Sequence, residues 1–180
     1  MSLEILKFPH PFLRKKAVPV TKVNQKIRNL LEAMFQTMKE HLGLGLAAIQ
    51  VGRLEKVFVA GGDSHKIALV NPELIEKSSL EIMDEGCLSL PGIYLPIERA
   101  ARVKVAGLNL QGKKVIIEET GLLARAFQQE LDHLEGILII DRVPVTVLKE
   151  ELEKLEKNIV QEQNKIEPIL IAAIRREKGI

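Results

Sequence analysis

Residues 121–136 read GLLARAFQQELDHLEG, and this stretch decides the fold. Its apolar residues recur at helical spacing, and a glycine follows the last of them, which is a common way for a helix to end. Glu130 and His133 match the second half of the His-Glu-x-x-His motif, in which two histidines one turn apart share a metal ion and the glutamate is the general base. The stretch therefore predicts a helix over 121–134 that carries a candidate general base, Glu130, and a candidate metal ligand, His133.

Gln129 stands where this motif has its first histidine. An imidazole nitrogen is a good donor to first-row metal ions, whereas the neutral carbonyl oxygen of glutamine is a poor ligand for Zn²⁺ and Fe²⁺. A Glu-x-x-His pair on an amphipathic helix also occurs without any metal, with the glutamate at the surface and the histidine at the edge of the core. The helix alone leaves both interpretations open.

Two further segments contain residue types that suit a functional site. Glu85-Gly86-Cys87-Leu88-Ser89 holds the only cysteine of the chain, which is either a small buried apolar residue or a thiolate metal ligand. Residues 43–52 read GLGLAAIQVG, and their glycines allow another backbone to approach closely. The same residues also fit a helix end followed by a tightly packed segment. A phosphate-binding loop is excluded because no Lys-Ser or Lys-Thr follows the glycines.

The rest of the chain predicts helices on either side of a β-rich region. Helical spacing of apolar residues marks 24–40, and an amphipathic helix rich in Lys and Glu starts at Thr146. Short apolar runs bounded by turn residues predict strands at 56–60, 66–70, 73–83, 103–105 and 114–118. The turn between the first two strands is expected at Gly61-Gly62-Asp63-Ser64, and Asn71-Pro72 is expected to close the second strand. The order helix, strands, helix predicts an α+β fold.

Length and composition fit one domain spanning 1–180, with 146–180 as a C-terminal helical extension. The 180 residues are 46% apolar and 28% charged, which is ordinary for a globular protein. A net charge of +2 without a long basic block excludes a nucleic-acid footprint and a polybasic membrane anchor. The single cysteine excludes an intrachain disulfide, and no apolar run nears the roughly 20 residues of a membrane span. We therefore expect a cytoplasmic protein, and because the sequence has no obvious apolar stripe beyond the core faces, we expect it to be a monomer.

In this order and spacing, the three segments resemble the three motifs of the peptide deformylases. The family patterns are Gly-x-Gly-Leu-Ala-Ala-x-Gln at 43–50, Glu-Gly-Cys-Leu-Ser at 85–89, and the metal-helix motif at 128–136, which departs only at Gln129. Residues 5–9, 13–14, 71–72 and 121–126 are similar to the family as well, and the similarity extends from about residue 3 to residue 150. It implies antiparallel β-sheets around a central helix that carries the metal motif, with further helices at the N-terminus and the C-terminus.

The resemblance implies a metallohydrolase of protein biosynthesis that removes the formyl group from the N-terminal methionine of nascent polypeptides. Members hold one divalent ion, often Fe²⁺ and otherwise Zn²⁺, Ni²⁺ or Co²⁺, through one cysteine, two histidines and a water. Carried over to this chain, the ligand positions are Cys87, His133 and Gln129. The catalytic positions are Glu130 as general base, with Gln50 and the backbone N–H of Leu88 as oxyanion donors. The substrate-lining positions are Gly43, Leu44, Gly45, Tyr94 and Arg99.

Gln129 leaves three interpretations of this resemblance open. The glutamine binds the metal weakly and the deformylase works with altered metal preference, or the site acts on another acyl amide. Alternatively, metal and activity are lost, and the fold binds N-terminal peptides or the ribosome without hydrolysis. Residues 149–165, rich in Lys and Glu, are then either a solvated helix face or a partner helix. The other histidines of the chain do not sit at ligand positions of the family, and the retained site residues favour a hydrolase: Cys87, Glu130, Gln50 and Leu88.

Overall fold

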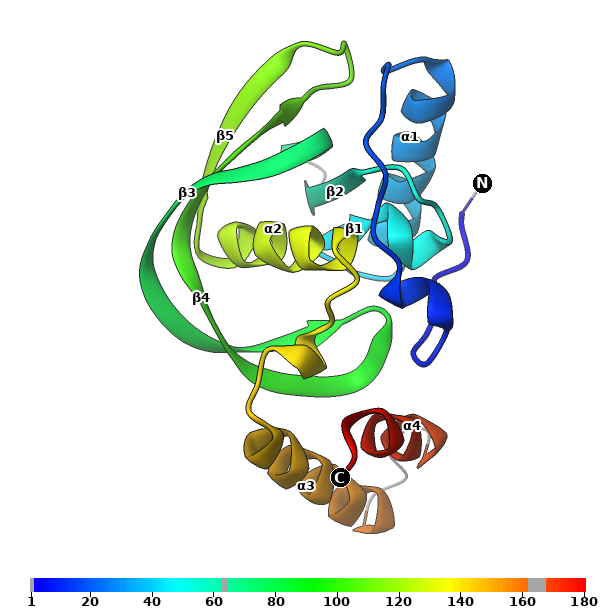
Figure 1. The fold of residues 1–180 in the computed structure, drawn as a ribbon, viewed down its shortest axis with the longest axis vertical. Helices are drawn as coiled ribbons and strands as arrows, with labels where there is room; N and C mark the ends of the chain where they lie inside the picture. Colours follow the sequence, from blue (N-terminus) through cyan, green and yellow to red (C-terminus); the bar gives the residue numbers. More distant parts are fainter. Residues whose placement is uncertain (1, 63–64, 162–167) are drawn as a thin grey trace.

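The computed structural model describes residues 2–62, 65–161 and 168–180, which form a five-stranded sheet and four α-helices (Figure 1). In chain order the elements are η1 (Pro11–Arg14), α1 (Gln25–Glu40), β1 (Gly45–Ala47), η2 (Ala48–Val51), β2 (Val57–Gly62), β3 (His65–Cys87), β4 (Leu90–Leu108), β5 (Lys114–Thr120), α2 (Gly121–Leu134), η3 (Ile139–Asp141), α3 (Val145–Gln161) and α4 (Pro168–Lys178). Neighbouring strands are antiparallel in the order β1-β2-β3-β4-β5. The α+β fold class is confirmed, and so are the helices predicted at 24–40 and 121–134.

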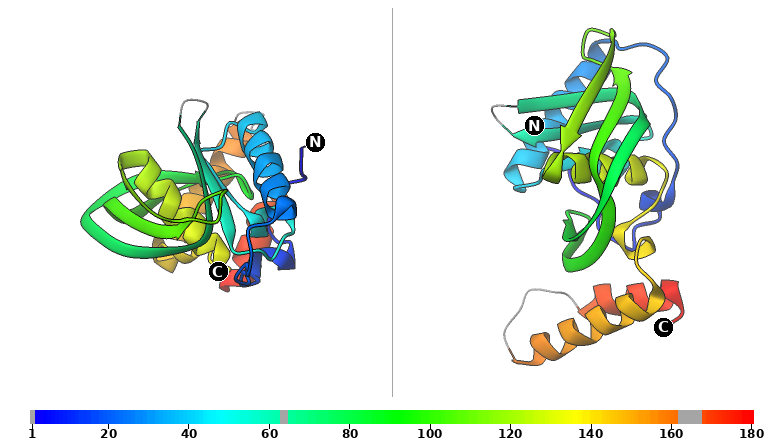
Figure 2. Two further views of the ribbon diagram at one scale, coloured as in Figure 1. Left: turned by 90° about the horizontal axis from the view of Figure 1, so that it is seen from above. Right: turned by 90° about the vertical axis from the view of Figure 1, so that its left-hand side faces the viewer.

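Strand β2 is buried on both faces because a helix covers each of them (Figure 2). Val57 and Val59 point to the apolar side of α1, whereas Phe58 and Ala60 point to α2. The ring of Phe58 meets that of Phe127 on α2 edge to face, with centroids 5.2 Å apart. This packing fixes α2 against the middle of the sheet, with its Glu-x-x-His segment inside the protein.

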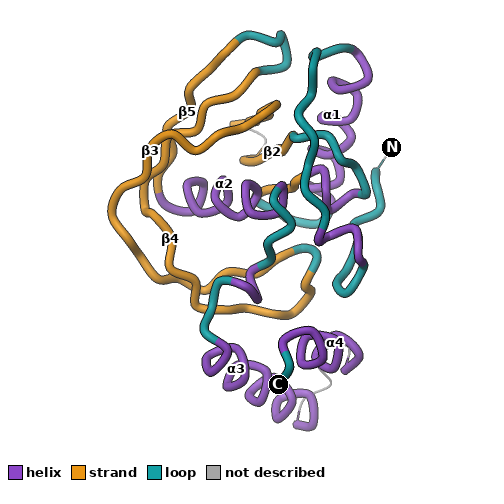
Figure 3. Tube along the Cα trace, in the orientation of Figure 1, coloured by secondary structure: helices purple, strands orange, loops and turns teal. Residues whose placement is uncertain are grey.

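Strands β3 and β4 form one long hairpin that curves around α2 (Figure 3). The separate strand predicted at 73–83 is wrong, because Asn71-Pro72 does not end the preceding strand. The pairing shifts register between Val70 and Glu73, which accommodates a proline that has no N–H to donate. Asn71 adopts a positive φ of 51° there, and its side-chain amide bonds both backbone groups of Val20 at 2.8 Å. The strand therefore continues to Cys87.

Helices α3 and α4 lie together beyond the closed end of this hairpin (Figures 1 and 2). Their buried residues share one apolar cluster with the start of β4, and the members from these elements include Leu90, Ile93, Leu95, Leu148, Leu152, Leu170, Ile171 and Ile174. The helix predicted from Thr146 corresponds to α3, and the last part of the Lys- and Glu-rich segment, 162–165, lies outside the described residues, as do Asp63 and Ser64 of the predicted turn. In the part of the chain that is described, no helix has the length and apolar character to cross a membrane.

Candidate active site

The three segments singled out in the sequence line one cleft of about 490 Å³. Gly43–Gly45 and Gln50 come from β1 and its flanks, residues 85–88 from the end of β3 and the turn that follows it, and Gln129 and Glu130 from α2. Strand β1 ends the sheet, so one of its two edges is paired to β2 and the other is not part of the sheet. The cleft therefore combines an open strand edge with the polar side of the central helix.

Glycines make room for this arrangement at two points. A methyl group on Gly45 would lie 2.9 Å from Cδ of Glu130, which is closer than real side chains approach. A methyl group on Gly86 would lie 2.8 Å from the ring of Tyr94, which covers that glycine and is itself 63% exposed. Close packing of Glu130 against β1 thus explains one glycine of the first motif, and Tyr94 explains the glycine of the second.

Cys87 lines the cleft, and the fully buried His133 lies behind it, with Sγ and Nε2 3.3 Å apart. Two ligands of one tetrahedral ion, at about 2.3 Å for sulfur and about 2.1 Å for nitrogen, lie about 3.6 Å apart. The observed separation is close to that value, so this pair fits a shared divalent cation. Burial lowers the pKa of His133 to about 4, which keeps the imidazole neutral as a ligand must be. Burial raises the pKa of the Cys87 thiol to about 12, and the carboxylate of Glu130 adds to that effect.

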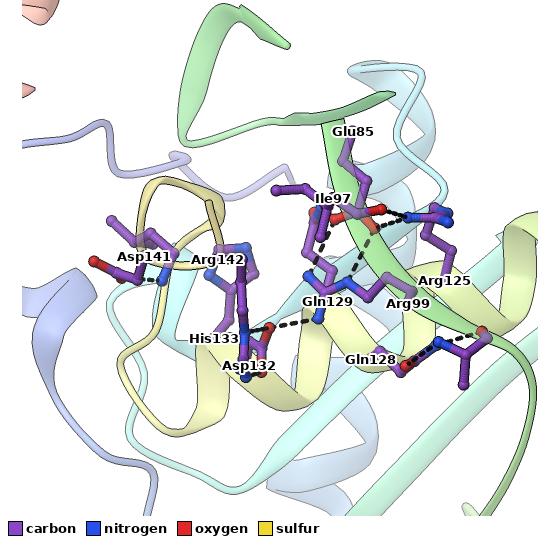
Figure 4. Close-up of polar contacts among 12 residues, drawn as sticks. Glu85, Ile97, Arg99, Arg125, Gln128, Gln129, Asp132, His133, Asp141 and Arg142 are labelled. Carbon is purple, nitrogen blue, oxygen red and sulfur yellow. Dashed lines mark hydrogen bonds and ion pairs between the residues drawn. The ribbon is translucent and has the colours of Figure 1, made fainter. Parts of the chain in front are cut away.

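Gln129 breaks the usual set of three protein ligands. Among the described residues, no group of three His, Cys, Asp or Glu side chains is placed to hold a metal ion. The amide Nε2 of Gln129 donates to Oε2 of Glu85 and to the carbonyl oxygen of Gly86, both at 3.1 Å (Figure 4). The side chain is thus fixed at the edge of the cleft, one residue before Glu130.

Glu130 is buried, with 2% of its surface exposed, and its Oε2 has no hydrogen-bond partner among the described residues. Burial raises the pKa of this carboxyl well above its usual range, and the positive charge of Arg99 partly opposes the shift. A carboxyl group with a raised pKa can both accept and return a proton near neutral pH. Glu130 therefore has the environment that a general acid–base residue needs.

Gln50 lines the cleft next to Cys87. Its Oε1 accepts from the backbone N–H of Ala47 at 2.8 Å, and its Nε2 donates to Oγ of Ser89 at 3.3 Å and faces Sγ of Cys87 at 3.7 Å. Leu88 lies between β3 and β4, directly after the cysteine, and it lines the cleft. Both candidate oxyanion donors are therefore within the same cleft as Cys87.

Arg99 does not line the cleft, contrary to the expectation carried over from the resemblance. Its guanidinium is buried and donates to both oxygens of Glu85, at 3.0 and 3.1 Å, and to Asp132 at 2.6 Å (Figure 4). Arg125 adds a third donor to Glu85 at 2.8 Å, and Arg142 pairs with Asp132. Arg99 therefore ties the end of β3 to α2 from behind, and its side chain faces a separate hollow on the far side of the helix.

Sequence patterns do not predict this ion-pair cluster or several residues that line the cleft, among them Lys7. Lys7 lines the cleft and donates to the carbonyl oxygen of Leu88, and burial lowers its pKa. Glu85 and Asp132 both lie inside the motifs, close to the proposed metal ligands. Two carboxylates in a buried site need cationic partners, so these two residues could have indicated the buried arginines. Lys7 carried no such signal, because only the folded chain brings it to Leu88.

Comparison with known proteins agrees with the geometry of the cleft. A family model for polypeptide deformylases matches residues 2–173. The peptide deformylase of Halothermothrix orenii is 49% identical over 143 residues, covering 78% of this chain and 93% of the relative. That of Dictyoglomus turgidum is 46% identical over 153 residues, covering 84% and 99%. The crystal structure of a peptide deformylase from Legionella pneumophila superposes with a TM-score of 0.81 at 34% identity, covering 92% of this chain and 99% of that one.

A second crystal structure, of the peptide deformylase from Thermotoga maritima, has a TM-score of 0.76 at 43% identity and covers 80% of this chain and 99% of its own. The matched residues include β1, the end of β3 and α2, which are the elements that form the cleft. All of these relatives bear the name of the enzyme, and none supports a binding protein without chemistry. By sequence, fold and cleft alike, the chain belongs to the peptide deformylase family, whose members are metallohydrolases that remove the formyl group from N-terminal methionine.

Proposed function

We propose that this chain hydrolyses the formyl amide of nascent peptides with a divalent cation held by Cys87 and His133. The observation that carries the proposal is the 3.3 Å approach of His133 Nε2 to the Sγ of Cys87, a residue that lines the same cleft as Glu130. A thiolate and an imidazole suit Fe²⁺, Zn²⁺, Ni²⁺ and Co²⁺. Of these ions, we propose Fe²⁺ as the one bound in the cell. When bound, such a cation lowers the pKa of a water and polarises the formyl carbonyl.

The other groups of the cleft bind the peptide and move the proton. The segment Gly43–Gly45, which leads into β1 and lines the cleft, offers backbone groups to an extended peptide, which adds as a further strand. Tyr94 borders the same cleft. Glu130 takes the proton of the attacking water and returns it to the leaving amine, so that formate and a free N-terminus result.

Gln50 and the backbone N–H of Leu88 act as donors to the oxygen of the formyl group as it gains negative charge. Gln50 is held for that task, because its own carbonyl accepts from Ala47 and leaves the amide nitrogen directed toward Cys87 and Ser89. A donor fixed in this way contributes about 3 kcal/mol to transition-state stabilisation. We further propose a cytoplasmic monomer that meets its substrates as they leave the ribosome.

The test is metal content of the anaerobically purified protein together with formate release from formyl-Met-Ala-Ser. We expect one ion per chain with turnover in the wild type, and loss of both in Cys87→Ser. His65→Ala is a matched control, because this histidine is exposed and pairs with Glu119 far from the cleft. Metal retained in full by Cys87→Ser would exclude Cys87 as a ligand and overturn the proposal.

A further inference from the structure

The amide of Gln129 is held in one orientation. Its two acceptors, the Glu85 carboxylate and the Gly86 carbonyl, have no proton to give, so the NH₂ group and not the carbonyl must face them. In a planar amide the carbonyl oxygen is bonded to the same carbon as that nitrogen and points away from the nitrogen's partners. Gln129 also lines the cleft, beside Glu130. Its Oε1 is therefore turned away from Glu85 and Gly86.

Glu85 is rigid enough to enforce that orientation. Arg99 binds both of its oxygens, Arg125 binds Oε1, and the carboxylate is 4% exposed (Figure 4). Turning the Gln129 amide over would set its carbonyl oxygen against a buried carboxylate and a backbone carbonyl, and would remove the two hydrogen bonds that Glu85 and Gly86 now accept from it. The ion pairs that hold Glu85 in place thus select one orientation of the amide.

These partners are the ones that a metal-bound imidazole uses. A histidine ligand donates its second ring N–H to a carboxylate or a backbone carbonyl, which orients the ring and makes it more basic. Gln129 donates to one of each. An imidazole and an amide also share the layout in which the donor nitrogen and the atom with the free lone pair are joined through one carbon. The amide can replace both halves of a ligating histidine, with oxygen in place of nitrogen.

We propose that Gln129 is a ligand through Oε1 and completes a sulfur, nitrogen and oxygen set with Cys87 and His133. This rests on the proposed function, since it presumes that the cation sits between those two side chains. A neutral carbonyl oxygen binds Zn²⁺ and Co²⁺ less tightly than imidazole does, and it suits Mn²⁺ comparatively well. The chain accordingly binds Zn²⁺ and Co²⁺ more weakly than its Gln129→His variant, and it discriminates less between Zn²⁺ and Mn²⁺.

The test is an anaerobic titration of the metal-free full chain with Co²⁺, read from the thiolate-to-cobalt absorption band. We expect Gln129→Ala to weaken binding by at least about tenfold, since even the loss of an outer contact weakens metal sites by about 10–100-fold. Gln129→His should tighten it. Gln128→Ala is the matched control, because the neighbouring amide bonds Ala100 on another face of α2 and should leave Co²⁺ binding unchanged.

A second measurement uses the unaltered protein, in case Gln129→Ala does not fold. The readout is the ¹³C NMR chemical shift of the side-chain carbonyl carbon. Addition of Zn²⁺ should change this shift for Gln129 and leave it unchanged for Gln128. Equal Co²⁺ affinity of the wild type and a folded Gln129→Ala, or no shift of the Gln129 carbonyl carbon while Zn²⁺ binds, overturns the ligand role and leaves the Cys87–His133 site intact. Failure of the wild type to bind either ion would overturn the metal site of the proposed function as well.

Discussion

Replacing Arg99 by methionine separates a structural role of this residue from contact with substrate. The guanidinium is 5% exposed and makes two hydrogen bonds to Glu85 and one to Asp132. Methionine keeps the apolar stem but removes the charge and all three bonds. Because Arg99 faces away from the cleft, we expect the effect to appear in stability before it appears in substrate binding.

The magnitude follows from what the two carboxylates retain. Removing one partner of a buried ion pair destabilises a protein by about 3–5 kcal/mol, because a buried charge is left unpaired. Here Arg125 still donates to Glu85, and Arg142 still donates to Asp132. We therefore expect the lower end, about 3 kcal/mol. In a chain of this size each kcal/mol shifts Tm by about 2–4 °C, so the melting temperature should fall by about 10 °C.

The assay is urea and thermal unfolding of the variant, with Michaelis kinetics on formyl-Met-Ala-Ser. Arg102→Met is the matched control on the same strand, since its side chain is 51% exposed and pairs with Glu118, so it should change stability by less than about 1 kcal/mol. If Arg99→Met is no less stable than Arg102→Met, the proposed structural role of Arg99 is refuted. A rise in KM at unchanged stability would instead restore Arg99 to the substrate side.

Three further predictions concern the interior of the cleft. Gly45→Ala places a methyl 2.9 Å from Cδ of Glu130, so kcat should fall by at least about tenfold with a smaller effect on KM, and unchanged kinetics would show that Glu130 has room to move. Glu130→Gln keeps the shape of the side chain but cannot carry the proton, so kcat should fall by about 10²–10⁴ while Co²⁺ still binds; loss of Co²⁺ binding would point to Glu130 as a ligand. In chelator-treated protein the pKa of His133 is lowered from 6.5 to about 4. Between these two pH values the imidazole is protonated in the unfolded chain and neutral in the folded chain. The free energy of unfolding should therefore fall by about 3 kcal/mol between pH 6.5 and pH 4. His133→Phe should lack that part of the pH dependence, and an identical pH profile in both proteins would contradict the burial of a neutral imidazole.

The helices could be predicted from the sequence because the features that indicate a helix lie within a few residues of one another. The helix predicted at 121–134 has the bounds of α2, since apolar spacing and the following glycine are both local features. The long hairpin could not be read in the same way. Pairs such as Glu85 with Leu95 depend on register over many residues, and Asn71-Pro72 looks like a strand end unless the bulge and the Val20 contact are known.

The candidate site divides along the same line. The motifs alone identify Cys87, Gln50 and Glu130; the fold brings them into one cleft and places the buried His133 in contact with Cys87. The partners that orient those residues belong to distant segments without a pattern of their own. Arg99 meets Glu85 from the facing strand, and an arginine in a strand is otherwise indistinguishable from one that faces solvent.

The brevity of β1 has a consequence for self-association. An unpaired strand edge that accepts a peptide is also a place where a second copy of the chain, or an unfolded segment, can add and start an aggregate. Here the strand spans only Gly45–Ala47, all three residues are buried, and a 3-10 turn follows at once. Such an edge offers too few backbone groups to hold a long foreign strand, so it has room for the short extended peptide proposed above while it limits the risk of fibril-like growth.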